Sequence, residues 1–101
     1  MKTTNKLKII LLTVKKYGSS SLINSLCMYL NIFPLQAIYV LRETMDLNYI
    51  YFNKAIACYC LTESGNNFLL KCNLIDFDID KGYSETGKNN FIDTEFYNTL
   101  D

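Results

Sequence analysis

The stretch that decides the fold is YCLTESGNNFL, residues 59–69. Leu61 is placed to close a hydrophobic core, and Thr62 is typical of the N-cap of a helix that follows it. Because glycine has no Cβ atom, Gly65 allows this helix to approach the preceding strand closely. The stretch therefore predicts a strand that leads through a capped turn into a helix.

Upstream of it, apolar residues at spacings of three and four predict three helices. The first covers residues 5–17 and ends near Gly18. Residues 19–21 are serines, which offer N-cap oxygens for a second helix that stops around Asn31. The third helix starts at Pro34, whose fixed φ suits a first turn, and ends near Asn48. We expect these apolar residues to be buried: Leu7, Ile10, Leu11, Val14 and Tyr17 in the first helix, Leu22, Ile23, Leu26 and Leu30 in the second, and Ala37, Val40, Leu41 and Met45 in the third.

The pattern changes after residue 48. Residues 49–52 and 55–61 are rich in aromatic and β-branched side chains, which predicts two antiparallel strands joined by a tight turn at Asn53 and Lys54. The helix that Thr62 caps has Phe68, Leu69 and Cys72 as its apolar positions.

Beyond Asn73 the pattern changes again, because Ile75, Phe77 and Ile79 alternate with aspartates. This alternation predicts a strand with one apolar face. From Lys81 the chain is polar and interrupted by glycines, so we expect a loop or a disordered segment there.

The 101 residues are enough for one domain with a core, and half of them are apolar. The ten basic and ten acidic side chains are unevenly distributed: residues 1–72 hold eight basic and three acidic ones, and residues 73–101 hold two and seven. We therefore predict a basic domain over residues 1–72, followed by an acidic C-terminal extension over 73–101.

The residue types disfavour catalysis and metal binding. The chain has no histidine, the commonest general base and zinc ligand. It also lacks a phosphate-binding glycine motif, so we expect no enzyme, no cofactor and no metal site. Cys58 and Cys60 form a C-x-C pair, which is either a metal or redox pair or, as we favour, two small apolar side chains on one face of a strand. The apolar run at 9–12 is too short for a secretory signal or a membrane span, which predicts a cytoplasmic protein with reduced thiols.

The order of these elements resembles the winged helix-turn-helix family of small DNA-binding regulators. YCLTESGNNFL closely resembles the "Y-x-L-T-x-x-G-x-x-F-L" sequence with which that family leaves its β wing. The segments LCMYLNI (26–32) and PLQAIYVL (34–41) resemble its helix-turn-helix, although the family usually has a leucine at the position of Thr44. The resemblance covers residues 7–72. It implies an α+β, mainly α fold with three helices, a two-stranded β wing and a C-terminal helix.

The resemblance also implies a function: sequence-specific binding of double-stranded DNA by a transcriptional regulator, with the third helix in the major groove. The residues that we expect to contact DNA are Ser20, Ser21, Leu35, Gln36, Tyr39, Arg42, Lys54, Lys6 and Lys8. Gln36 has the groups to pair with adenine, Arg42 to reach guanine or a phosphate, and the lysines to line a phosphate track.

Three points stay open. The third helix carries little positive charge, so the alternative is a protein-interaction module that uses Leu35, Ile38 and Tyr39. A homodimer is expected from the family and from the apolar residues of the first and last helices. The acidic extension either has a regulatory role, in which it folds back on the basic domain and competes with phosphates or engages another protein, or is a solubilising segment that adds a strand or packs on a dimer partner.

Overall fold

The computed structural model describes residues 3–86, which form five helices and one two-stranded antiparallel sheet. The elements are α1 (Thr3–Tyr17), α2 (Leu22–Leu30), α3 (Pro34–Asp46), β1 (Ile50–Asn53), β2 (Cys58–Leu61), α4 (Glu63–Lys71) and α5 (Ile79–Thr86). The fold is therefore α+β and mainly helical, as the sequence predicts.

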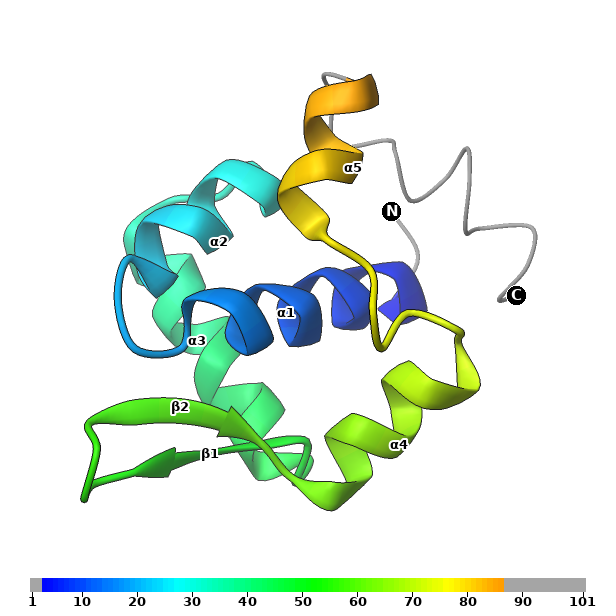
Figure 1. The fold of residues 1–101 in the computed structure, drawn as a ribbon. Helices are drawn as coiled ribbons and strands as arrows, with labels where there is room; N and C mark the ends of the chain where they lie inside the picture. Colours follow the sequence, from blue (N-terminus) through cyan, green and yellow to red (C-terminus); the bar gives the residue numbers. More distant parts are fainter. Residues whose placement is uncertain (1–2, 87–101) are drawn as a thin grey trace.

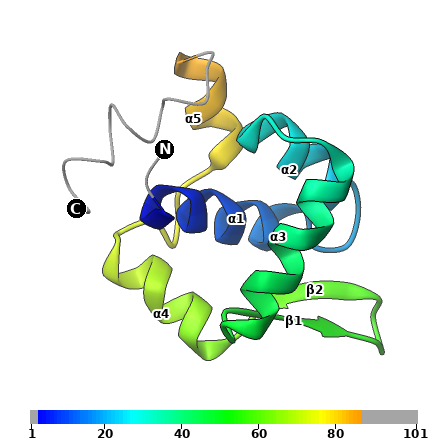
Figure 2. The same ribbon diagram turned by 180° about the vertical axis from the view of Figure 1, so that it is seen from behind.

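Helix α1 lies at the centre of the molecule and packs against α2, α4, α5 and β2 (Figures 1 and 2). Seven consecutive residues, at 8–14, are buried, so α1 is covered on nearly all sides rather than along one stripe. The apolar residues of this helix therefore contribute to the core of their own chain.

Helices α2 and α3 cover one side of α1. The second helix buries Tyr29 and Ser25 in addition to the predicted Leu22 and Leu26, whereas the predicted Ile23 and Leu30 are only half-buried. The expected serine cap is absent, because Ser21 has a left-handed backbone and its side chain makes no capping hydrogen bond.

In α3 the buried residues are Ala37, Val40, Leu41 and Thr44. Met45, which we expected in the core, is half-buried, and Thr44 takes the core position instead. The Thr44 hydroxyl is satisfied there, because it donates to the carbonyl of Val40 at 2.7 Å.

The β-hairpin pairs Ile50 with Leu61 and Asn53 with Cys58. Its second strand begins three residues later than predicted, because residues 54–57 form the turn. On its other edge β2 contacts the loop after α1, where the N–H of Tyr59 donates to the carbonyl of Gly18 at 3.0 Å. A Cβ atom on Gly18 would lie only 2.1 Å from the carbonyl oxygen of Tyr59, so this close approach requires glycine.

Helix α4 is capped as predicted, since the Thr62 side chain accepts a hydrogen bond from the N–H of Gly65 at 3.1 Å. The close approach expected at Gly65 is also present. A Cβ atom there would lie 2.3 Å from the carbonyl oxygen of Tyr49, just before β1. The backbone of α4 thus meets the backbone of the hairpin directly.

The segment after α4 differs from the prediction. Residues 75–79 form no strand and 81–86 form no loop; turns lead instead into α5, whose N-terminus is capped by Asp78 through hydrogen bonds from the N–H groups of Asp80 and Lys81. Leu74 and Ile79 are buried in the core of the preceding helices. The described part of the acidic extension therefore belongs to the same folded unit, while residues 87–101 lie outside the described residues.

Within residues 3–86 no single helix combines the length and apolarity needed to cross a membrane, although α2 and α3, which meet at a bend of 100°, pass that test as a pair.

Candidate nucleic-acid interface

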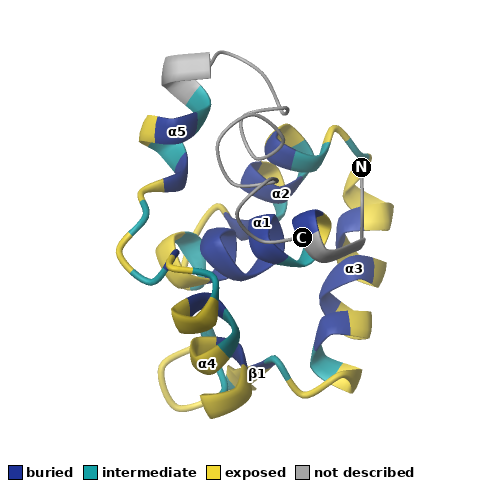
Figure 3. Ribbon diagram, turned by 90° about the vertical axis from the view of Figure 1, so that its right-hand side faces the viewer, coloured by how far each residue is buried: buried dark blue, intermediate teal, exposed yellow. Residues whose placement is uncertain are grey.

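The outer face of α3 is exposed along its length, while its inner face is buried (Figure 3). Leu35 is 62% exposed and Tyr39 52% exposed, and Arg42 is exposed one turn further on. These residues are spaced by four and three, so they lie on one face of the helix. The structure thus brings together three of the predicted contact residues, and Ile38 (45% exposed) flanks them.

Gln36 has a structural role that the sequence analysis missed. Its side-chain oxygen accepts a hydrogen bond from the backbone N–H of Phe33 at 2.9 Å, which satisfies a free donor at the start of α3. A bidentate contact with adenine needs the amide oxygen as well as the amide nitrogen. In this conformation Gln36 retains only its NH₂ group for a contact with DNA.

Ser20 and Ser21 are exposed in the loop before α2. The loop borders an open hollow of about 560 Å³, whose other sides are formed by Ile38 of α3 and by Phe52 of the hairpin. The start of α2, the outer part of α3 and the hairpin therefore share one side of the molecule. Leu35, Tyr39 and Arg42 extend this side along α3.

Lys54 is exposed in the hairpin turn, which projects from the body of the molecule (Figure 1). The turn is fixed by Asn53, whose side-chain oxygen accepts from the N–H of Ala55 at 3.0 Å. Next to Lys54 the hairpin exposes Phe52 and Ile56. These two apolar residues were not among the predicted contacts, although their position on a short hairpin indicated that they would be exposed.

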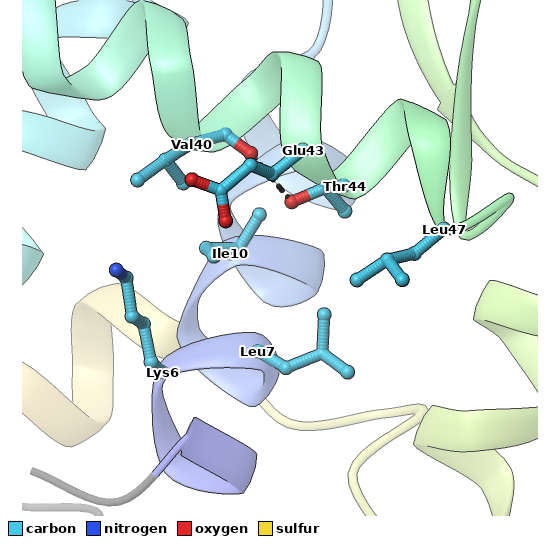
Figure 4. A pocket seen from close by; sticks show the side chains of 7 residues that line it. All are labelled: Lys6, Leu7, Ile10, Val40, Glu43, Thr44 and Leu47. Atoms are coloured by element: carbon cyan, nitrogen blue, oxygen red, sulfur yellow. Dashed lines mark hydrogen bonds between the residues drawn. The ribbon is translucent and has the colours of Figure 1, made fainter.

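The two predicted N-terminal lysines differ in position. Lys6 is exposed at the rim of a hollow of about 240 Å³ between α1 and α3, opposite Glu43 (Figure 4). Lys8 is only 1% exposed, and its Nζ donates to the Asn5 side-chain oxygen at 3.1 Å. The expectation that Lys8 contacts DNA is therefore wrong, because two residues along a helix turn the side chain to the opposite face and α1 is buried there as well.

Lys16 is also unavailable as a free cation. Its Nζ lies 2.7 Å from an oxygen of Asp78 and 2.9 Å from an oxygen of Asp80. Tyr17 donates a hydrogen bond to the same Asp80. The hydrogen bond from Lys16 lowers the pKa of Asp78, and hydrogen bonds to Asp78 and Asp80 raise the pKa of Lys16. For Asp80, burial acts in the opposite direction, but the hydrogen bonds from Tyr17 and Lys16 outweigh it and lower its pKa.

This contact bears on the role of the acidic extension. Residues 78 and 80 fold back on the basic domain, one of the two arrangements that the sequence left open, and they neutralise a lysine there. The apolar residues between the aspartates pack in the core of the same chain rather than adding a strand.

The charge of the candidate interface is close to balanced. Arg42 and Lys54 are its cations, and Glu43 and Asp46 are exposed on the same helix as Arg42. The surrounding exposed groups are apolar: Phe33, Leu35, Ile38, Tyr39, Phe52 and Ile56. Any ligand of this side therefore meets few charges and much apolar surface.

The predicted homodimer has less apolar surface than expected, because the apolar residues of α1 are mostly buried within the chain. Leu70 on α4 and Leu47 after α3 remain strongly exposed. The homodimer stays a prediction.

Comparison with protein-family models, with curated proteins and with solved structures found no match to this chain.

Proposed function

We propose that this chain is a winged helix-turn-helix protein that binds double-stranded DNA and regulates transcription. In this proposal α3 enters the major groove, the hairpin is the wing, and the loop before α2 lies beside the phosphate backbone. The observation that carries it is the exposure, on one side of the molecule, of Ser20, Ser21, Leu35, Tyr39, Arg42 and Lys54.

The small number of cations on this side determines how DNA binding would depend on salt concentration. Each phosphate that a cation neutralises contributes about −0.9 to the slope of log K against log salt. With Arg42 and Lys54 as the cations of this side, we expect a slope of about −2, which is shallow for a DNA-binding domain. Most of the affinity would then come from polar and apolar contacts by residues such as Tyr39 and Leu35.

The test is fluorescence anisotropy of labelled random-sequence duplexes, titrated with the full chain at several salt concentrations. We expect Arg42→Ala to weaken binding and Lys54→Ala to lower the salt slope by about 1. Lys71→Ala is the matched control, because Lys71 is an exposed cation at the far end of α4 and away from the hairpin (Figure 1). Absence of salt-dependent binding, or an equal loss with Lys71→Ala, would contradict the proposal.

A second candidate is a protein partner on the same side, favoured by the exposed apolar residues of α3 and the hairpin. The two candidates differ in their response to substitution. A protein interface requires Leu35 and Ile38, so Leu35→Asp would abolish it, while Arg42→Ala would have little effect. In the DNA proposal Arg42→Ala weakens binding as well, so the response to this substitution separates the two candidates.

A further inference from the structure

The two cysteines of β2 lie on the outer face of the hairpin. Side chains alternate along a strand, so Cys58 and Cys60 share one face, and Tyr59 and Leu61 share the other. Tyr59 and Leu61 pack against the core, whereas neither Cys58 nor Cys60 belongs to the core cluster of the described residues. Both thiols are half-buried and free. Their position therefore differs from that of two small apolar side chains that fill a core.

The two thiols are neighbours. The Cys58 Sγ donates to the carbonyl of Tyr59 at 3.3 Å, and the Cys60 Sγ donates to the carbonyl of Cys58 at 3.7 Å. Burial raises the pKa of the Cys58 thiol, and a hydrogen bond with the Cys60 side chain raises it further. Alternate residues of a strand point to the same side, so the two thiol groups lie next to each other on the outer face of β2.

Cys58 and Cys60 are among the residues that line a hollow of about 290 Å³ between the C-terminal end of α1 and β2. Lys15, Lys16 and Asn66 are among the residues that line it. Lys16 is held by Asp78 and Asp80, whereas Lys15 is exposed and lines the same hollow as the two cysteines. The hollow therefore combines two sulfur ligands with a nearby positive charge.

We propose that Cys58 and Cys60 form a two-thiolate binding site for a soft monovalent metal ion, Cu(I). Thiolates are the protein ligands that Cu(I) prefers. Two sulfur–metal bonds form, two S–H bonds break, the two protons pass to solvent, and no electron is transferred. The product carries one negative charge, and Lys15 contributes a positive charge to the same hollow.

The same residues disfavour a divalent structural metal. Structural zinc takes four protein ligands, almost always cysteine or histidine. The chain has no histidine, and within residues 3–86 no group of three or more histidine, cysteine, aspartate or glutamate side chains gathers in one place. Two sulfur ligands suit an ion that accepts a low coordination number, and this proposal does not depend on whether α3 binds DNA.

The experiment is an anaerobic titration of the reduced full chain with Cu(I), in competition with the chromogenic Cu(I) chelator bicinchoninate. Native mass spectrometry gives the stoichiometry, and X-ray absorption at the copper edge gives the number of sulfur neighbours. We expect one copper per chain with two sulfur ligands. Cys58→Ser and Cys60→Ser should each weaken binding by at least about 100-fold, because each removes one of the two ligands.

The matched control is the variant with Cys27→Ala and Cys72→Ala, which removes the other two half-buried thiols and should leave the affinity unchanged. Circular dichroism shows whether each variant is folded, and the serine variants should be folded because their side chains lie outside the core. The proposal is overturned by unchanged affinity in either serine variant, by loss of binding in the control, or by one copper shared between two chains.

Discussion

Substituting Gly65 by alanine tests whether the contact between α4 and the hairpin sets the packing of this domain. A Cβ atom at this position would lie 2.3 Å from the carbonyl oxygen of Tyr49 and 3.3 Å from its carbonyl carbon. Neither neighbour is a flexible side chain, so the first turn of α4 has to move away from β1. The same carbonyl of Tyr49 accepts a hydrogen bond from the N–H of Thr62 at 3.0 Å, and the Thr62 side chain accepts one from the N–H of Gly65. A movement of the first turn of α4 therefore disturbs both hydrogen bonds.

The expected loss in the free energy of unfolding follows from these contacts. Forcing a methyl group into a closely packed site costs about 1–3 kcal/mol, and weakening an N-cap costs about 1 kcal/mol. Alanine is the better helix former by about 1 kcal/mol, which offsets part of the loss. We therefore expect Gly65→Ala to lower the free energy of unfolding by roughly 1–3 kcal/mol, which in a domain of this size lowers the Tm by about 5–20 °C.

The assay is urea unfolding of the full chain, followed by far-ultraviolet circular dichroism, together with a thermal scan. Ser64→Ala is the matched control, because Ser64 is exposed in the same helical turn and its substitution should change stability by less than about 0.5 kcal/mol. If Gly65→Ala were as stable as the wild type, the close approach to Tyr49 would not constrain α4, and the reasoning would be refuted.

Three further predictions concern other parts of the fold. Thr44→Leu should raise the Tm by a few degrees, because the added carbons extend into the hollow of about 240 Å³ between α1 and α3; a lower Tm would contradict this. Ile79→Ala should destabilise the chain to urea by about 2–5 kcal/mol, since Ile79 is buried in the common core; a loss below about 0.5 kcal/mol would show that α5 is a separate segment. Because the hydrogen bond from Lys16 lowers the pKa of Asp78, their contact stabilises the folded state above pH ~4, the ordinary carboxyl range, and is lost as the pH falls through the lowered value. The stability difference between the wild type and Asp78→Asn should therefore be present at neutral pH and disappear in acid; a difference that persists in acid would point to another cause.

The first four helices and the hairpin follow from patterns that are local in the sequence. Helical spacing of apolar residues located α1, α2 and α3, and the change to aromatic and β-branched residues located the hairpin. The prediction failed at residues 75–79, where alternation of apolar residues with aspartates is typical of a strand. The competing signal was Asp78, whose side chain caps α5 and so favours a helix start over an extended chain.

Part of the candidate interface could also be predicted from local patterns in the sequence. Spacing alone places Leu35, Tyr39 and Arg42 on one exposed face of α3. It does not reveal that Lys8 is buried, because that depends on how many elements surround α1 in space. The use of Gln36 as a capping residue had a sequence signal, since Pro34 begins the helix and Gln36 stands at its third position, where glutamine commonly bonds back to the N-cap N–H.

The distribution of charge in space changes what the basic composition of residues 1–72 implies. Burial removes Lys8 from the surface, and Asp78 and Asp80 neutralise the exposed Lys16, so Lys6 and Lys15 are the other exposed lysines of α1. The cations therefore do not combine into the phosphate track that the sequence suggested. Non-specific DNA affinity depends on the number of such cations, so it should be weak for this chain. Tight binding to DNA would therefore require specific contacts by α3. The slope of log K against log salt, more than the affinity itself, then distinguishes a DNA ligand from a protein partner.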